Sequence, residues 1–271
     1  MSSIHAPVSD RLSLPSVEYA IVDHCNLKCA HCDHLSPHFA PTFVSLGDVR
    51  RDVVDFATVA IVDDFRIVGG EPLLHPDLPA ILDAVRDAGI ARSISLWTNG
   101  VVLHRHISAV LSKIDVLEIS RYPGVRIRRL NEILEAAEAA GCQVTAKDMD
   151  RFIECYPKTR IEDRARVQAI YEGCRNAHVW HCHSVKRGRY YKCSRAPLIH
   201  EVRGMTSAEI ERDSVELAGP SGCERLRAYR SKSSPLSACS WCLGTDGPEG
   251  DHEQLDRHRR AAEASALGLV F

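Results

Sequence analysis

Short apolar runs alternate with helical patterns through the first 150 residues, and this alternation limits the possible folds more than any other feature of the sequence. Apolar residues recur on one helical face after Ser45, after Asp77, around residues 106–113 and from Leu130 to Ala137. The runs between them are β-branched and short, as in buried strands, at residues 17–22, 65–68, 93–97, 116–120 and 143–146. Strands separated by helices indicate a parallel sheet. Five strands and four helices predict an α/β fold, a partial (β/α) barrel that is shorter than the closed form with eight of each.

The second half of the chain has a different character. Residues 147–177 are charged and weakly patterned, and residues 179–185 and 189–193 then flank Lys186-Arg187-Gly188, which predicts a β-hairpin. Short helices are expected near residues 207–213 and 221–229, and an amphipathic helix over 251–266. We therefore expect three units, which are a partial barrel (1–150), a small hairpin-and-helix domain (151–250) and a C-terminal helix (251–271).

The chain holds 11 cysteines. The redox state of the compartment decides whether they form disulfides or stay reduced and free to bind metal. Residues 1–10 carry no apolar signal-peptide segment, and no apolar run approaches the roughly 18 residues of a membrane span. We expect a cytoplasmic protein, in which thiols stay reduced, and the odd number also disfavours a full disulfide set. The net charge of -2 argues against a broad nucleic-acid surface. Metal or iron–sulfur ligation is the favoured interpretation.

Three cysteines stand within eight residues in Cys25-Asn26-Leu27-Lys28-Cys29-Ala30-His31-Cys32, directly after the first predicted strand. Such spacings let one loop place three sulfurs around one centre. A zinc site of three cysteines and one histidine and an iron–sulfur site both fit this segment. The candidates for a fourth ligand are His24, His31, His34 and His38.

Polar motifs also follow the next three predicted strands. They are Gly69-Gly70-Glu71-Pro72, Thr98-Asn99-Gly100 and Ser120-Arg121-Tyr122-Pro123. Alone, each is an ordinary turn sequence. Because the carboxyl ends of parallel strands lie on one edge of a barrel, where active sites are built, we expect them to meet there.

Together, the Cys-x3-Cys-x2-Cys and Gly-Gly-Glu-Pro segments resemble the radical S-adenosylmethionine (radical SAM) superfamily. The resemblance implies a [4Fe-4S] cluster on Cys25, Cys29 and Cys32, with one iron left open for S-adenosyl-L-methionine. It implies cofactor contacts by residues 69–72 with the methionine amino group, by Thr98 and Asn99 near the ribose and carboxylate, and by Ser120. His31 takes the place before the third cysteine, which is commonly aromatic and packs near the adenine. The residues implied in cofactor binding are His31, Gly69, Gly70, Glu71, Pro72, Thr98, Asn99 and Ser120.

The later cysteines resemble an auxiliary-cluster domain. Cys174, Gly188 and Cys193 have the spacing that opens the SPASM and Twitch domains, and Cys239-Ser240-Trp241-Cys242 follows as a knuckle. Pro248 stands where a full SPASM domain has its next cysteine, so the shorter Twitch domain is the better match. This implies an auxiliary [4Fe-4S] cluster on Cys174, Cys193, Cys239 and Cys242, with Cys182 as rival to Cys174 and a zinc knuckle as the alternative. Cys142 and Cys155 are expected to pack as small buried residues.

The layout as a whole resembles the 2-deoxy-scyllo-inosamine dehydrogenase-like group of radical SAM enzymes. That resemblance implies a 5′-deoxyadenosyl radical that abstracts hydrogen from a small carbohydrate, aminocyclitol or nucleoside-like substrate, in natural-product (antibiotic) biosynthesis. Dehydrogenation of a secondary alcohol is favoured, with an electron donor such as flavodoxin or ferredoxin, and neither nucleic acid nor membrane as partner. Arg121 and Tyr122 are candidates for positioning the alcohol. Alternatives are an epimerase with Cys182 or Cys223 as hydrogen donor, sulfur insertion, peptide modification and a zinc-binding module.

Overall fold

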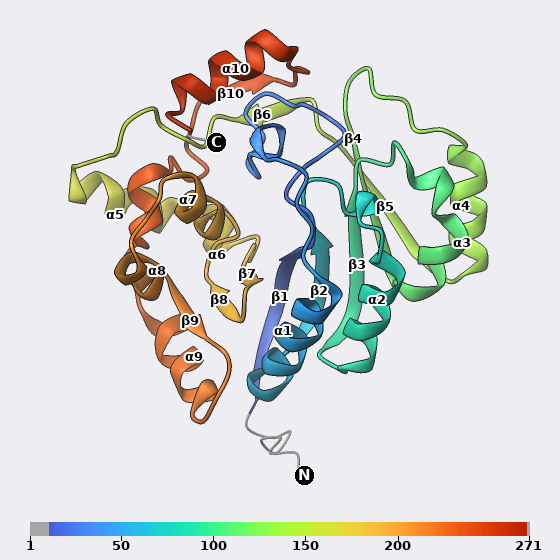
Figure 1. The fold of residues 1–271 in the computed structure, drawn as a ribbon, viewed down its shortest axis with the longest axis horizontal. Coiled ribbons are helices and arrows are strands. Elements are labelled where there is room, and N and C mark those ends of the chain that lie inside the picture. The colour runs from blue at the N-terminus through green and yellow to red at the C-terminus, as the bar shows by residue number, and fades with distance from the viewer. Residues whose placement is uncertain (1–10, 270–271) are drawn as a thin grey trace.

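A computed structural model describes residues 11–269 and contains the predicted partial barrel (Figure 1). Its five parallel strands lie in the order β5-β4-β3-β2-β1. They are β1 (Leu12–Ala20), β2 (Ala60–Val68), β3 (Ala91–Thr98), β4 (Val116–Arg121) and β5 (Gln143–Asp148). The helices between them are α1 (Leu46–Val59), α2 (Leu78–Asp87), α3 (Ile107–Val110) and α4 (Leu130–Ala139). The α/β fold class is thereby confirmed, and α3 is a single turn flanked by 3-10 turns.

The helices cover one face of the sheet. Alternate side chains of β1 are apolar and pack against these helices. Val17, Tyr19 and Ile21 are buried on the helix side, where the Tyr19 ring stacks on Phe65 at 6.0 Å between centroids. The Tyr19 hydroxyl donates to Asp52 of α1 at 2.7 Å. Successive side chains of a strand point to opposite faces, so Glu18 points to the face without helices. This second face is polar and forms the interior of the partial barrel.

The predicted hairpin is confirmed and extends the same sheet. β7 (Ser184–Lys186) pairs with β1 in parallel and with β8 (Arg189–Tyr191) in antiparallel, and β9 (Ser214–Glu216) follows β8. Arg187 and Gly188 both have positive φ, 53° and 72°, as a two-residue type I′ turn requires. The strands are shorter than predicted, because the chain bends at His181 (φ 51°) before it reaches β1.

The remaining helices surround this hairpin, and their predicted positions are partly right. α8 (Ser207–Asp213) has the predicted bounds, whereas α9 (Gly222–Ser231) and α10 (Arg257–Ala266) differ at their ends. Three further helices were not predicted, namely α5 (Arg164–Gly173), α6 (Arg175–His178) and α7 (Ala196–Val202). A small antiparallel pair, β6 (Arg151–Ile153) and β10 (Glu249–Asp251), brings the C-terminal segment back to the barrel.

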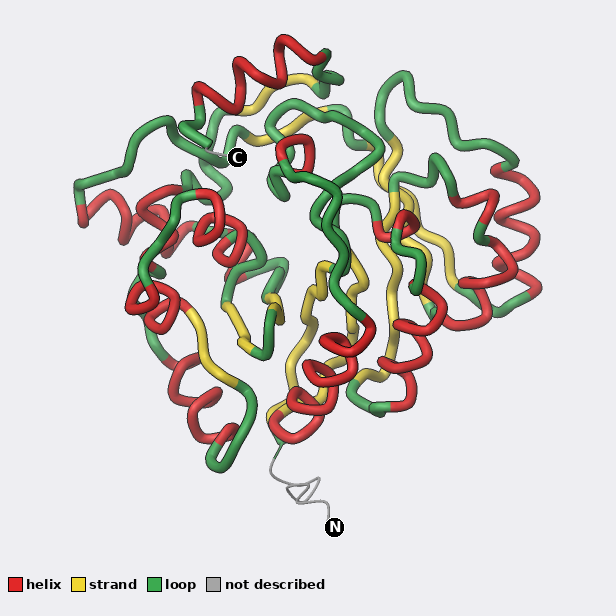
Figure 2. Tube along the Cα trace, viewed as in Figure 1, coloured by secondary structure: helices red, strands yellow, loops and turns green. Residues whose placement is uncertain are grey.

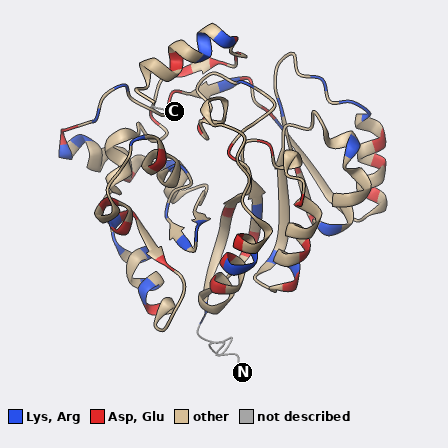
Figure 3. Cartoon of the chain, viewed as in Figure 1, with Lys and Arg blue, Asp and Glu red and all other residues tan. Residues whose placement is uncertain are grey.

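The loops that follow the parallel strands gather at the edge where β1 to β4 end (Figure 2). Charges of both signs are interspersed over the outer helices in the same view (Figure 3). Among the described residues, no helix is both long and apolar enough to cross a membrane.

Candidate active site

The loop with the first three cysteines follows β1 and is fixed at both of its sides. Val22 forms a bridge with Phe43 on one side, and Cys29 forms a bridge with Gln254 on the other. Gln254 Nε2 donates to Cys29 Sγ at 3.2 Å, and His252 Nε2 lies 3.2 Å from the same sulfur. Hydrogen bonds to sulfur are typical of cysteines that bind iron–sulfur clusters. The C-terminal segment thus supplies polar groups to the cysteine loop, and no sequence pattern predicted this contact.

The paired glycines allow this loop to sit directly on the end of β2. Gly70 N donates to the Val22 carbonyl at 2.7 Å. A Cβ atom at Gly70 would lie 2.0 Å from the His24 carbonyl oxygen, and one at Gly69 would lie 2.5 Å from the Val22 oxygen. Any side chain would therefore displace the cysteine loop. The glycines serve the close approach of two backbone segments.

Glu71 joins the second motif to the third. Its side chain is fully buried, and its carboxylate accepts hydrogen bonds from Thr98 Oγ1 (2.7 Å), Asn99 N (2.8 Å) and Leu73 N (3.1 Å). Burial raises the pKa of Glu71 to about 7 although these donors oppose the shift. Asn99 Nδ2 continues the connection, because it donates to Asn26 at 2.7 Å and to Cys25 Sγ at 3.5 Å. The ends of β1, β2 and β3 thus form one hydrogen-bonded unit.

Replacing Glu71 by glutamine is expected to lower the free energy of unfolding by about 1–3 kcal/mol at pH 8, because the new amide group opposes one of three backbone or hydroxyl donors. The folded pKa lies above the unfolded value, so the wild-type contribution falls as pH rises from about 4.5 to about 7. The difference in the free energy of unfolding between wild type and variant should therefore increase when the pH is lowered from 8 to 5.5. Anaerobic denaturant titration at both pH values measures it, and a gap that narrows on acidification contradicts this assignment.

The side chains of the fourth motif, residues 120–123 at the end of β4, point to different surroundings. Tyr122 packs among Phe152 and His252, with ring centroids 6.1 Å and 5.1 Å away. Burial, together with the nearby thiols of Cys29 and Cys32, raises the pKa of Tyr122. Arg121 instead pairs with Asp148 at 2.9 Å in an exposed position. Of the two predicted positioning residues, Tyr122 therefore faces the cysteine loop and Arg121 does not.

His31 lies at the same edge, between two acidic residues. Its backbone N–H donates to Glu263 Oε1 at 2.8 Å, and its Nδ1 lies 3.8 Å from Glu154. Its left-handed backbone (φ 55°) turns the loop between the second and third cysteines.

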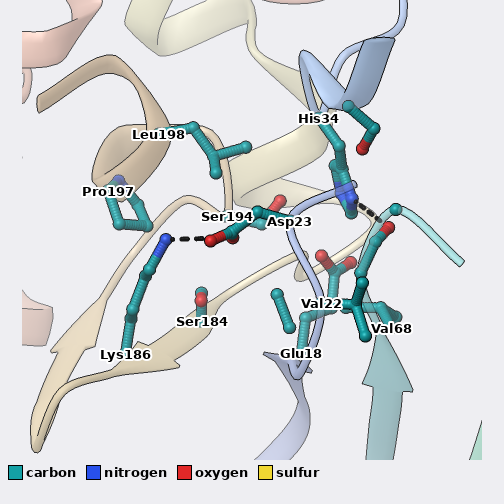
Figure 4. A pocket seen from close by; sticks show the side chains of 14 residues that line it. Glu18, Val22, Asp23, His34, Val68, Ser184, Lys186, Ser194, Pro197 and Leu198 are labelled. Atoms are coloured by element: carbon teal, nitrogen blue, oxygen red, sulfur yellow. Dashed lines mark hydrogen bonds and ion pairs between the residues drawn. The ribbon is translucent and has the colours of Figure 1, made fainter. Parts of the chain in front are cut away.

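A pocket opens on the interior side of the same loops (Figure 4). Asp23 accepts from Lys186 Nζ at 3.3 Å, and His34 Nδ1 is bonded to the Gly69 carbonyl at 2.8 Å. Glu18 and Lys186 enter from β1 and β7, and the buried Ser36 hydroxyl has no partner within the described residues. Sequence reasoning missed Glu18, although a lone carboxylate inside an apolar strand is a usable signal. The pocket is also lined by Gly69, Gly70, Ser184 and Ser194.

Four later cysteines surround a second cavity. Cys174, Cys193, Cys239 and Cys242 come from three separate segments, and all line this space together with Arg195. Asn176 Nδ2 donates to Cys193 Sγ at 3.5 Å and Gly244 N to Cys242 Sγ at 3.3 Å. Burial raises the pKa of Cys193 to about 12, so its thiolate needs a nearby cation. In the described part of the chain, no three His, Cys, Asp or Glu side chains converge closely enough to hold a single metal ion.

One ion pair connects the two cysteine sites. Arg195 Nη2 lies 3.4 Å from Asp33, the residue after Cys32, and Arg195 Nη1 donates to the Gly244 carbonyl at 2.9 Å. Arg195 is almost fully buried, and its Nε has no partner within residues 11–269. No sequence pattern predicts this pair, since Asp33 and Arg195 are far apart in the chain.

The remaining cysteines do not line the four-cysteine cavity, although Cys155 lies close to Cys193, Cys242 and Arg195. Cys182 does not line the four-cysteine cavity and packs against Glu18. Cys223 lies 3.6 Å from the Thr58 and Val59 carbonyls, at the end of α1 where β2 begins. This is the end of the sheet opposite the motifs, so Cys223 lies away from them, and its role as a hydrogen donor stays a prediction. Cys142 and Cys155 are buried as predicted.

Comparison with known proteins gives a family match for part of the chain. Residues 19–121 match the family model described as Radical SAM superfamily, so this part of the chain is similar to that superfamily. This family uses a [4Fe-4S] cluster and S-adenosyl-L-methionine. The cysteine loop, Gly69–Pro72 and Thr98–Gly100 all lie within the matched range.

Among curated relatives, the chain is 29% identical over 134 residues to GTP 3',8-cyclase of Tolumonas auensis, and the match covers 45% of this chain and 39% of that protein. It is 27% identical over 158 residues to GTP 3',8-cyclase 1 of Mycobacterium tuberculosis, covering 51% and 44%. The chain thus spans less than half the length of these relatives. A solved structure of BtrN with AdoMet and 2-DOIA is 16% identical, with a TM-score of 0.41 over 51% of this chain and 58% of BtrN. Streptococcus suis SuiB bound to S-adenosylmethionine is 20% identical, with a TM-score of 0.41 over 51% and 34%.

Proposed function

We propose that this protein is a radical SAM dehydrogenase that oxidises a secondary alcohol of a small, polyhydroxylated substrate. The observation that carries the proposal is the four-cysteine cavity, which is joined to the first cysteine loop by the Asp33–Arg195 pair. A second cluster in that cavity would be an electron acceptor close to the radical site. Glu18, Asp23 and three serines line the pocket beside Gly69 and Gly70, and these groups would bond to the hydroxyls of a small substrate.

The residues at the first site fit the cofactors of the family. Cys25, Cys29 and Cys32 would hold the [4Fe-4S] cluster, and the backbone of Gly69–Pro72 with Thr98 and Asn99 would position S-adenosyl-L-methionine. When bound and reduced by a donor such as flavodoxin or ferredoxin, this group supplies a 5′-deoxyadenosyl radical. The amide groups of Gln254 and Asn99, which donate to Cys29 and Cys25, stabilise the thiolates that iron requires.

The interior pocket would hold the substrate and receive its proton. Oxidation of a secondary alcohol to a ketone removes one hydrogen atom from carbon, one proton from oxygen and one electron. In our proposal the hydrogen atom ends in 5′-deoxyadenosine, and Glu18 accepts the proton. Cys174, Cys193, Cys239 and Cys242 would hold a second cluster, which would supply the acceptor for the electron. The Lys186–Asp23 pair and the free Ser36 hydroxyl would orient the substrate hydroxyls.

A second candidate is a radical rearrangement of a nucleotide, because the matched relatives are named GTP 3',8-cyclase. In a rearrangement the substrate radical regains a proton and an electron after hydrogen abstraction, so the reaction needs an electron donor and no final electron acceptor. Product mass separates the two candidates, since a dehydrogenation product is two hydrogens lighter and a rearrangement product has the mass of its substrate.

The experiment uses the reconstituted protein with S-adenosyl-L-methionine, a reductant and candidate aminocyclitols, sugars and nucleosides, some deuterated at the carbinol carbon. We expect deuterium in 5′-deoxyadenosine and a ketone product. An isobaric product from GTP, with no ketone from any alcohol, would contradict dehydrogenation.

Replacing Glu18 by glutamine is expected to lower ketone formation at least about 100-fold while 5′-deoxyadenosine formation persists, because proton removal is lost and radical generation is not. Glu118→Gln is the matched control, since Glu118 is a buried glutamate on β4 that does not line the pocket. Equal losses of ketone formation in the two variants would contradict the proposal that Glu18 accepts the proton. Mass spectrometry of both products provides the measurement.

A further inference from the structure

A third cavity adjoins the four-cysteine site and is lined by cations. Lys192, Arg230 and Lys232 line it together with His178, His181 and His183, and Glu172 is its acidic residue. Its atom-free space is about 910 Å³, open solvent included. Tyr171 and Ala177 line both this cavity and the four-cysteine cavity, so the two are neighbours. We call it the basic cavity.

The three cations of the basic cavity lack a carboxylate partner. Within residues 11–269, none of Lys192, Arg230 and Lys232 forms an ion pair. Glu172 instead accepts from Gln168 Nε2 at 2.6 Å. Lys192 is buried and Arg230 is half-buried, and a buried charge without a counter-ion is unfavourable unless a ligand completes it. The surplus of three cations over one carboxylate therefore points to an anionic ligand.

Aromatic rings hold the cations in position without neutralising them. Lys192 Nζ lies 5.5 Å and Lys232 Nζ 5.7 Å from the centre of the Tyr229 ring, and Lys192 also donates to the Lys232 carbonyl. Lys192 is only 8% exposed, so it forms the floor of the cavity. Cation–π contact of this kind fixes two ammonium groups beside one another before any ligand arrives.

The buried His183 adds no charge to the basic cavity at neutral pH. His183 is bonded to the Tyr190 hydroxyl (2.6 Å) and the Ala177 carbonyl (3.1 Å), and burial lowers its pKa to about 4. Burial and the neighbouring Arg230 and Lys232 lower the pKa of Lys192 to about 8. A bound anion would relieve the repulsion among Lys192, Arg230 and Lys232.

We propose that the basic cavity binds a phosphate group, free or carried by a small molecule. A phosphate carries close to two negative charges at neutral pH and three acceptor oxygens, which suit three converging cationic donors. The buried position of Lys192 favours a small ligand over a flat macromolecular surface. Both the oxidation proposed above and the alternative rearrangement leave this cavity without a role, so the inference stands apart from the proposed function.

The test measures phosphate binding to the reconstituted full chain in the absence of S-adenosyl-L-methionine. Isothermal titration at low ionic strength with inorganic phosphate and with a nucleoside monophosphate should give saturable binding at one site per chain. Tighter binding of the nucleoside monophosphate identifies a phosphorylated small molecule as the ligand, and equal binding identifies free phosphate. Absence of saturable binding by both probes overturns the proposal.

Variants at the end of α9 and directly after it show whether the basic cavity is the site. Arg230→Gln and Lys232→Gln should each weaken binding about tenfold, as expected for loss of a charged hydrogen bond. Arg227→Gln removes the same charge from an exposed position on the same helix and should leave binding unchanged. Arg230→Lys retains the cation and should recover most of the affinity. Equal weakening by Arg227→Gln and Arg230→Gln would mean non-specific attraction and would overturn the proposal.

Discussion

Replacing Cys29 by alanine is expected to remove about four irons per chain and to abolish 5′-deoxyadenosine formation. Cys29 is the buried member of the first three cysteines, and its sulfur has polar contacts to both His252 and Gln254. Two remaining thiols cannot hold a four-iron cluster against loss to solvent. Iron analysis and electron paramagnetic resonance of the reconstituted variant provide the measurement.

The matched control for this prediction is Cys142→Ala. Cys142 is also a buried thiol, but it lies beside Gln143 at the start of β5 and outside both cysteine sites. This variant should keep the wild-type iron content and activity. If Cys29→Ala retained the full iron content, the assignment of the first site would be wrong.

Replacing Cys174 by alanine is expected to lower iron from about eight to about four per chain, whereas Cys182→Ala should leave about eight. The reason is geometric, because Cys174 lines the cavity with the other three cysteines and Cys182 does not. Cys174→Ala should still release 5′-deoxyadenosine, but it should lose ketone formation because the electron acceptor is missing. The reverse pattern of iron loss would make Cys182 the ligand.

Metal analysis of the wild type and of the Cys174→Ala and Cys182→Ala variants also shows whether the second site holds iron or zinc. A zinc knuckle at Cys239 and Cys242 would give a full zinc content in the wild type and no second iron signal. Metal analysis of the same samples therefore decides between the two kinds of site.

Much of the barrel follows from local sequence patterns. Ser45 accepts from Asp48 N at 3.1 Å at the start of α1, and Gly141 has the left-handed backbone (φ 69°) that ends the α4 region. Both effects depend only on neighbouring residues, so they can be predicted from one sequence. The motifs after β1, β2 and β3 could also be placed, because parallel strands carry their carboxyl ends to one edge.

The contacts that complete the candidate site depend on distant pairings. Gln254 on Cys29 and Arg195 with Asp33 join residues more than 150 positions apart. Helix α5 escaped prediction because its apolar pattern is weak and only Tyr171 is buried. Glu71 was expected to accept from the cofactor, but its carboxylate is used by Thr98, Asn99 and Leu73, which only the folded chain reveals.

The most direct test of the account is the release of 5′-deoxyadenosine from S-adenosyl-L-methionine by the anaerobically reconstituted, dithionite-reduced protein. Chromatography with mass detection measures it, with Cys29→Ala as the blank. We predict release by the wild type and none by the variant. Bound zinc without iron, together with no release by the wild type, would contradict the account.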